Sequence, residues 1–348
     1  MDANKYILPV TTADLRRAAL EGRPARTAGV YAIPLLTADG ERTLLEARPA
    51  TMSSPLAQAI SAGAAHAMLL QSGGSILSWG SDTYKQITDS PDDDGYTAIS
   101  AGGPTLTGGH SMALLSDGSI LSWGRDTDDE VTDTPAGTGY TAISAGRGFS
   151  LALKSDGAID AWGYDDADRV TNTPTGTGHT AIAAGSAGSL ALTADGSIEA
   201  WGENFHGQIT SKPTASGHTA IAYGSSHCLA VNADGEIVAW GLDNEDQVTN
   251  APVDSAYTAV AAGHRHSLAL KSDGSLVSWG SDADGEVTDT PSGTDFVAIS
   301  AGYYYSLALR SDGSFEVWGN FEGLLVGEYA VPCLTTDGKQ TLMALSVV

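Results

Sequence analysis

A tryptophan–glycine pair that recurs seven times constrains the fold more than any other feature of this sequence. Every tryptophan of the 348-residue chain is followed by glycine: Trp79, Trp123, Trp162, Trp201, Trp240, Trp279 and Trp318. The first interval is 44 residues long, and each of the next five is 39. A period of this length indicates a repeat architecture, in which each unit buries its apolar face against its neighbours.

Each unit reads as a set of short strands. In Tyr257–Pro291, alternating apolar residues are separated by turn residues, which predicts three or four strands: Thr258–Ala262, Ser267–Leu270, Leu276–Trp279 and roughly Glu286–Asp289. Asp-Gly pairs such as Asp273–Gly274 predict two-residue hairpins with positive φ. The intervals have no room for a long helix. We therefore expect an all-β, closed, seven-bladed propeller over residues 56–326.

The repeat also supports a family resemblance. The pattern A-G-x-x-H-S-L-A-L-x-S-D-G-S-I-x-x-W-G, followed in one unit by Gly207–Gln208, resembles the RCC1-type repeat throughout residues 56–326. This resemblance implies an RCC1-like β-propeller. It says little about activity, because RCC1-like proteins include exchange factors, enzyme inhibitors and binding propellers.

Two similar segments flank the repeats. We expect residues 1–28 to form an arm with a short helix at Ala13–Glu21, residues 29–55 a hairpin and linker, and residues 327–348 a second hairpin. Ten of sixteen positions are identical between Gly29–Leu44 and Gly327–Leu342. Because the first and last blades of a closed ring are neighbours, we expect the hairpins to pack together and to attach the ring to a larger assembly or a second copy.

Charge is concentrated on the repeats. Residues 56–326 hold 34 acidic and nine basic residues of a chain with net charge −25. Such a surface disfavours binding to nucleic acid or to anionic lipid. The excess of Asp has two open interpretations, adaptation to high salt (a halophilic protein) and the preference of turns for Asp. The chain shows no signal peptide and no apolar run long enough for membrane insertion, so we expect a virion surface or otherwise a cytoplasmic location.

Repeated residues are assigned to the scaffold. The seven tryptophans share one strand position, which favours packing between blades. His66, His110, His227 and His266 lie thirteen residues before a tryptophan, so we expect them to serve the repeat's own hydrogen bonding. Cys228 and Cys333 are expected to be free and buried. No catalytic triad, phosphate loop or HxxxH pair is present, and we expect no enzymatic activity.

The variable turns are better candidates for function. In each blade the first and third turns should emerge on one face of the ring. The residues fifteen and fourteen positions before each tryptophan vary, and they include Arg147, His264, Arg265, Tyr303 and Tyr304. Arg and Tyr are common interface anchors, so we expect these five to bind a protein or a cell-surface receptor. Drift at an unconstrained surface is the alternative.

The third turns are acidic. Carboxylates three residues after tryptophan predict an acidic rim: Asp82, Asp126, Asp165, Asp243 and Asp282. Asp282, Asp284 and Glu286 resemble the start of a calcium loop, but they do not supply the six to eight oxygens that calcium takes. Calcium is therefore a weak candidate, and no other metal or cofactor is expected.

The sequence favours a non-enzymatic display or attachment protein. An anchoring arm without an export signal fits a virus particle component, such as a capsid decoration, turret or tail-fibre protein that contacts a host surface. Acidic, regular arrays of this kind resemble those of halophilic or marine microbes and their viruses. The alternative is an intracellular RCC1-like regulator, either an exchange factor or a protein inhibitor.

Overall fold

The computed structural model describes residues 31–36, 42–47, 57–103, 108–320, 329–334 and 340–345. It divides the chain into two units, Met1–Ser54 with Gly327–Val348, and Pro55–Val326. The first unit contains two antiparallel hairpins, β1 (Tyr31–Leu36) with β2 (Arg42–Ala47), and β24 (Tyr329–Leu334) with β25 (Gln340–Leu345). These strand pairs lie within the predicted segments 29–55 and 327–348, and the packing of the two hairpins together stays a prediction. The predicted helix of the arm lies outside the described residues.

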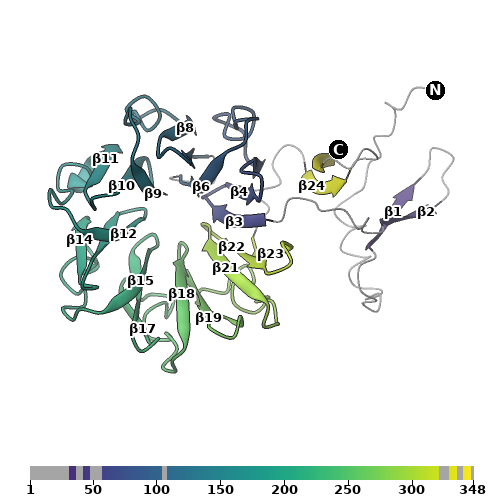
Figure 1. The fold of residues 1–348 in the computed structure, drawn as a ribbon. Helices are drawn as coiled ribbons and strands as arrows, with labels where there is room; N and C mark the ends of the chain where they lie inside the picture. Colours follow the sequence, from purple (N-terminus) through teal and green to yellow (C-terminus); the bar gives the residue numbers. More distant parts are fainter. Residues whose placement is uncertain are drawn as a thin grey trace. The chain divides into compact units, whose positions relative to one another are not determined.

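The second unit is a ring of seven three-stranded antiparallel blades, as the repeat predicted (Figure 1). The inner strands of blades 1 to 7 are β3 (Ala57–Ala62), β6 (Tyr96–Ala101), β9 (Tyr140–Ala145), β12 (His179–Ala184), β15 (His218–Tyr223), β18 (Tyr257–Ala262) and β21 (Phe296–Ala301). The middle strands are β4 (His66–Gln71), β7 (His110–Leu115), β10 (Phe149–Lys154), β13 (Gly188–Thr193), β16 (His227–Asn232), β19 (His266–Lys271) and β22 (Tyr305–Arg310). The outer strands are β5 (Ile76–Gly80), β8 (Ile120–Gly124), β11 (Ile159–Gly163), β14 (Ile198–Gly202), β17 (Ile237–Gly241), β20 (Leu276–Gly280) and β23 (Phe315–Gly319).

The possible fourth strand is not formed. Glu286–Asp289 is a turn, and the equivalent loop of blade 3 contains the short 3₁₀ helix η1 (Asp166–Asp168). The reason is local hydrogen bonding, because the Asp282 carboxylate accepts the amides of Val287 and Thr288 at 2.9 and 2.8 Å. Amides that are bonded within the loop cannot join a strand ladder. Each blade therefore ends at its tryptophan strand.

The Asp-Gly turns differ in detail from the predicted two-residue hairpins. Gly118 has a φ of 80°, whereas Asp117 is not among the residues with positive φ. The Gly118 amide donates to the Leu115 carbonyl at 3.0 Å, which describes an ordinary turn followed by one left-handed glycine. A Cβ atom at Gly118 would lie 2.5 Å from the Gly139 nitrogen, so the crossing segment packs too closely for any other residue.

Among the described residues of the ring, the core consists of seven apolar clusters, and each of them lies between two neighbouring blades. One cluster joins the last blade to the first through Leu307, Leu309, Ile60 and Leu69. Every described blade is built from three consecutive strands, so the ring closes by side-to-side packing and not by exchange of a strand between blades. The Tyr305 hydroxyl strengthens this closure, because it lies 3.0 Å from the carbonyl oxygen of Gly63 and 2.9 Å from that of His66.

The tryptophans connect each blade to the blade before it. Six indole nitrogens donate to a backbone carbonyl of the preceding blade at 2.8 to 2.9 Å, 37 residues earlier for the first pair and 32 residues earlier for the other five: Trp123 to Gln86, Trp162 to Glu130, Trp201 to Arg169, Trp240 to Gln208, Trp279 to Gln247 and Trp318 to Glu286. Trp79 stacks on Phe315 of blade 7, with ring centroids 5.5 Å apart. These contacts confirm that the tryptophans are structural.

The repeated histidines also join neighbouring blades. Four imidazole Nε2 atoms contact a serine hydroxyl of the next blade at 2.7 to 2.9 Å: His66 with Ser111, His110 with Ser150, His227 with Ser267 and His266 with Ser306. Burial lowers their pKa values to about 4, 3, 3 and 4, so the rings are neutral at pH 7. The prediction that they serve the scaffold is confirmed.

Blade 4 solves the same packing problem differently. Its histidine position is Gly188, and the following blade supplies Tyr223 where the other inner strands end in alanine. A Cβ atom at Gly188 would lie 3.1 Å from the Tyr223 hydroxyl, so the phenol occupies the space that a histidine ring takes elsewhere. The serine position of blade 5 is Cys228, a fully buried free cysteine whose thiol pKa is raised by burial.

Candidate functional site: the mouth of the central channel

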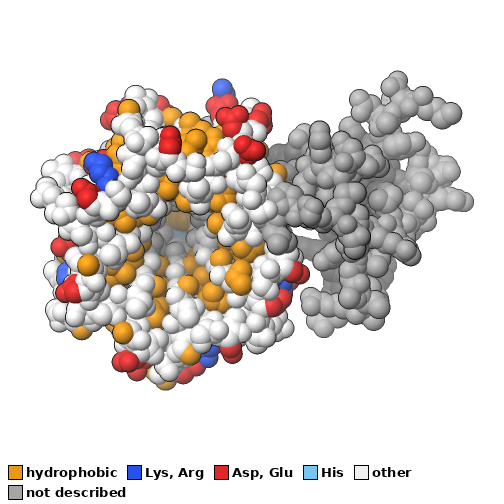
Figure 2. Space-filling model, viewed as in Figure 1, with side chains coloured by type: hydrophobic (Ala, Val, Ile, Leu, Met, Phe, Trp, Pro, Cys, Tyr) orange, Lys and Arg blue, Asp and Glu red, His pale blue; other side chains and the backbone are white. Residues whose placement is uncertain are grey.

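The inner strands surround a hollow at the centre of the ring (Figure 2). Its volume is about 440 Å³, part of which is open to solvent. It lies at the end of the ring where each inner strand runs into an Ala-Gly or Tyr-Gly pair, such as Ala145–Gly146. On the face shown, acidic side chains gather near the outer edge, whereas apolar side chains surround the hollow. We call the end of the hollow that is lined by these Ala-Gly and Tyr-Gly pairs the mouth.

A series of backbone hydrogen bonds between neighbouring blades fixes the mouth. In blades 2 to 6 the amide after the glycine donates to a carbonyl of the next blade, as Arg147 does to Gly185 at 3.1 Å and Ser186 does to Gly224 at 3.0 Å. The glycines allow this approach, because a Cβ atom at Gly185 would lie 2.4 Å from the Gly224 carbonyl oxygen. The residue after each glycine is therefore held rigidly at the edge of the hollow.

One repeat position thus lines the mouth. In blades 1 and 2 it holds the small residues Ala64 and Gly103. In blades 3 to 7 it holds five polar residues, which we call the polar arc: Arg147, Ser186, Ser225, His264 and Tyr303. The arc is asymmetric on a nearly symmetric ring, which is the arrangement expected of a recognition surface on a fixed scaffold.

Most of the polar arc is internally bonded. The Ser186 and Ser225 hydroxyls are 3.2 Å apart, and Ser225 lies 2.8 Å from Nδ1 of His264. The imidazole stacks on Tyr303 with ring centroids 4.0 Å apart and an interplanar angle of 11°. Burial, together with the charge of Arg265, lowers the pKa of His264 to about 4. A neutral, oriented imidazole therefore packs against the face of the half-buried Tyr303 ring.

The structure divides the five predicted binding residues into two groups. Arg147, His264 and Tyr303 lie together at the mouth. Arg265 turns outward, where its guanidinium bonds Glu245 at 3.0 Å in the third turn of the preceding blade. Tyr304 packs edge-on against Tyr303, with centroids 4.6 Å apart and an interplanar angle of 86°. The bond between Arg265 in a first turn and Glu245 in a third turn shows that first and third turns share one face.

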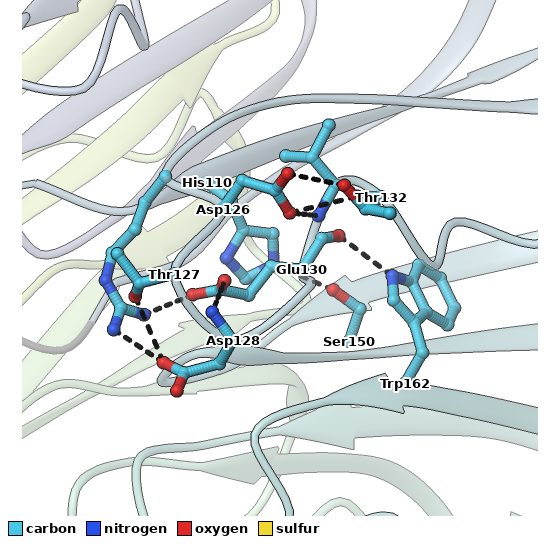
Figure 3. A network of polar contacts seen from close by, with 10 residues as sticks. His110, Asp126, Thr127, Asp128, Glu130, Thr132, Ser150 and Trp162 are labelled. Atoms are coloured by element: carbon cyan, nitrogen blue, oxygen red, sulfur yellow. Dashed lines mark hydrogen bonds and ion pairs between the residues drawn. The ribbon is translucent and has the colours of Figure 1, made fainter.

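The rim aspartates have a structural task. Each caps its own third turn, as Asp126 does by accepting the amides of Val131 and Thr132 and the Thr132 hydroxyl at 2.6 Å (Figure 3). Burial opposes ionisation of Asp126, but these hydrogen bonds outweigh it and lower the carboxyl pKa. The same bonds recur at Asp82, Asp165, Asp243 and Asp282, with an asparagine, Asn204, in blade 4.

The basic residues of this face are mostly paired. Arg125 bonds Asp128 at 2.6 Å and also the buried Glu130, while Arg169 lies 3.7 Å from Glu203. Arg147 differs from them, because it is exposed and forms no ion pair with any residue in the described part of the chain. The polar arc therefore carries an unneutralised positive charge on a strongly acidic protein.

The calcium candidates do not converge. Asp282 is occupied by its turn, and the Glu286 carboxylate points inward, is 1% exposed and accepts the Asp284 amide at 2.9 Å. Burial raises the pKa of Glu286. Within the described ranges, no group of three His, Cys, Asp or Glu side chains is placed to hold a metal ion. Nor does this part of the chain contain a helix long and apolar enough to cross a membrane.

Sequence reasoning missed other residues of this face. Phe205 is 84% exposed in the third turn of blade 4, and Tyr84 and Tyr164 are exposed in the third turns of blades 1 and 3. Ser186 and Ser225 were not among the predicted binding residues. A comparison within the repeat could have found Phe205, because Thr83, Thr127 and Asp166 hold the same position in blades 1 to 3.

Comparison with known proteins identifies the repeat. The family model described as "Regulator of chromosome condensation (RCC1) repeat" matches residues 140–167, 180–208, 219–247 and 257–286. A comparison with curated proteins finds no match.

Several solved structures share the fold. The ectodomain of the receptor kinase ACR4 from Arabidopsis thaliana is 22% identical, with a TM-score of 0.62 over 77% of this chain and 97% of that one. The ectodomain of the receptor kinase CR4 from Physcomitrella patens is 21% identical, with a TM-score of 0.64 over 82% and 78%. Prp20p from Saccharomyces cerevisiae is 21% identical, with a TM-score of 0.54 over 72% and 77%. Four of the seven repeats thus match the RCC1 repeat model, and the seven repeats together form a seven-bladed β-propeller.

Proposed function

We propose that this chain is a non-enzymatic binding protein that presents the mouth face of its propeller to a protein partner, such as a cell-surface receptor. The observation that carries the proposal is the polar arc. Repeated polar side chains elsewhere, such as the buried histidines, are consumed by contacts between blades. The arc instead gathers differing side chains at the edge of a hollow.

The composition of the face supports this role. Tyr and Arg are the residues most enriched among the strong contributors to protein interfaces. Here Tyr303 and Tyr304 form a packed aromatic pair beside His264, and Tyr164 and Phe205 are exposed on the surrounding third turns. Rigid aromatic side chains lose little conformational entropy on binding, so a preformed cluster favours affinity.

A hydrolase is the competing interpretation of the Ser225–His264 contact. Such a pair needs a basic imidazole and a third group that orients it. The pKa of His264 is lowered to about 4 by burial and by Arg265, which makes it a poor base at neutral pH. No carboxylate in the described part of the chain contacts its ring. The contact is better suited to fixing the imidazole against Tyr303.

The terminal segments supply the proposed attachment. Residues 1–55 and 327–348 carry almost no net charge, in contrast to the acidic ring, and contain two similar hairpins. We propose that they bind a larger assembly or a second copy, and that the assembly is a virus particle on which the propeller acts as a decoration, turret or tail-fibre protein. The alternative is an intracellular regulator. It is supported by the shared fold of Prp20p, a protein described for its binding to Gsp1p and histones.

Two perturbations test the proposal. Arg147→Ala and Tyr303→Ala should each weaken partner binding by about thirtyfold, and the double variant by several hundredfold, since interface anchors each contribute about 2 kcal/mol. Asp92→Asn with Val253→Ser is the matched control, because both residues are exposed in the crossings on the opposite face. An equal loss of partner affinity in the mouth variant and in the control variant would contradict a role for the mouth.

Deleting residues 1–28 separates the two functions. Loss of incorporation into a particle, with the ring still folded, supports attachment. A monomer that keeps its partner affinity and enters no assembly in either form supports the regulator.

A further inference from the structure

The mouth is preorganised on one side and positively charged on the other. Ser186, Ser225, His264 and Tyr303 form a continuous chain of contacts across blades 4 to 7. Arg147 belongs to blade 3, so it lies across the mouth from Tyr303 of blade 7. An entering group would therefore meet a guanidinium on one side and a fixed aromatic edge on the other.

Arg147 carries the unpaired positive charge among the described arginines near the mouth. The Arg125 guanidinium lies beside Gly148, next in the chain to Arg147, and Arg169 stacks over Tyr164 at 5.2 Å. Arg125 is paired with carboxylates of its own loop and Arg169 lies near Glu203 of blade 4, whereas Arg147 forms no ion pair among the described residues. Burial raises the pKa of Tyr303, and the positive charge of Arg147 acts in the opposite direction and lowers it, which is consistent with the two side chains lying near each other.

The charge of the whole chain limits what can enter. With a net charge of −25, the protein repels ligands that carry many negative charges. One guanidinium balances one carboxylate and matches its planar shape with two parallel hydrogen bonds. The aspartates of the third turns, such as Asp126 and Asp282, would in turn favour basic groups around that carboxylate.

We propose that the mouth binds one acidic side chain of the protein partner, a Glu or Asp that protrudes from an otherwise basic surface. Its carboxylate pairs with Arg147, and the Tyr303 hydroxyl and the serines of the arc supply further donors. This inference rests on the proposed function, since it names the chemistry of the partner at the same face.

A peptide titration tests the site without the partner. Acetyl-Lys-Glu-Lys-amide and acetyl-Lys-Gln-Lys-amide would be added to the full chain up to about 10 mM, and the guanidinium and imidazole NMR signals followed. We expect saturable shifts of Arg147 and His264 with the Glu peptide and at least about tenfold weaker binding of the Gln peptide. Sodium sulfate is a third arm, and it should bind more weakly than the Glu peptide.

Variants make the result decisive. Arg147→Gln should abolish the difference between the two peptides, and Lys85→Gln, which removes an exposed cation from another loop, should leave it intact. Equal binding of both peptides, tighter binding of sulfate, or an unchanged preference in Arg147→Gln would overturn the inference. Because no partner is present, this failure is distinguishable from failure of the proposed function, which the partner-binding assay measures separately.

Discussion

Replacing Tyr305 with phenylalanine tests how the ring is closed. In blades 1, 2, 5 and 6 a histidine bonds a serine of the following blade. At the junction of blade 7 with blade 1 this bond is absent, because blade 7 has Tyr305 at the histidine position and blade 1 has Ala67 at the serine position. Tyr305 bridges this junction by reaching the carbonyl oxygens of Gly63 and His66. The side chain is 1% exposed, so water cannot replace the hydroxyl.

The expected cost follows from what is left behind. The His66 carbonyl still accepts the Gly63 amide at 2.8 Å, whereas the Gly63 carbonyl loses its donor. One buried, unsatisfied carbonyl costs about 1–3 kcal/mol. For a domain of this size we expect Tyr305→Phe to lower Tm by about 2 to 8 °C.

Urea unfolding followed by tryptophan fluorescence measures the effect, with Tyr303→Phe as the control. Tyr303 is partly exposed at the mouth, and removing its hydroxyl should change stability by no more than about 0.5 kcal/mol. If Tyr305→Phe were as stable as the control, the closing hydrogen bonds would contribute nothing and the account of the last junction would be wrong.

Three further predictions concern the scaffold. Lowering the pH from 6.5 towards 4 should reduce the free energy of unfolding, because the unfolded chain binds protons at the histidines while the folded ring, with its lowered pKa values, does not. His227→Phe, which copies Phe149 of blade 3, should flatten that slope by up to about 1.4 kcal/mol per pH unit in urea titrations; an unchanged slope would argue against it. Gly185→Ala should destabilise by about 3 kcal/mol or more, since its Cβ would lie 2.2 Å from the Tyr223 ring, and Gly73→Ala, which meets nothing within 4 Å, should not; similar melting curves would contradict the packing. Asp282→Asn should cost less than about 1 kcal/mol and show no dependence on calcium in calorimetry, because blade 4 already uses asparagine there; stabilisation of the native protein by calcium would refute this.

The repeat made the ring predictable from sequence. Tryptophans at one position of every blade, and histidines at one position of four blades, pointed to contacts between blades, and indole and imidazole hydrogen bonds between blades are such contacts. The way in which a departure from the repeat in one blade is matched by a departure in the next blade was not predictable. The exchange at Gly188 and Tyr223 links positions in two blades, and nothing in the period of 39 residues shows that they meet.

The candidate site was predicted in part. Variation among first turns led to Arg147, His264 and Tyr303, which share the mouth. Neighbours in sequence point in different directions, however, and Arg265 bonds the third turn of the preceding blade. The direction in which each of these side chains points depends on the backbone hydrogen bonds between blades around the mouth. Apolar and polar periodicity carries no information about it.

The structure of the chain within its native assembly would test the central claim most directly. A cryo-electron microscopy map should show partner density against Arg147, Tyr303 and the third turns, with the Asp-Gly turns of the opposite face exposed to solvent. Partner density on the Asp-Gly turns, with the polar arc uncovered, would contradict the account.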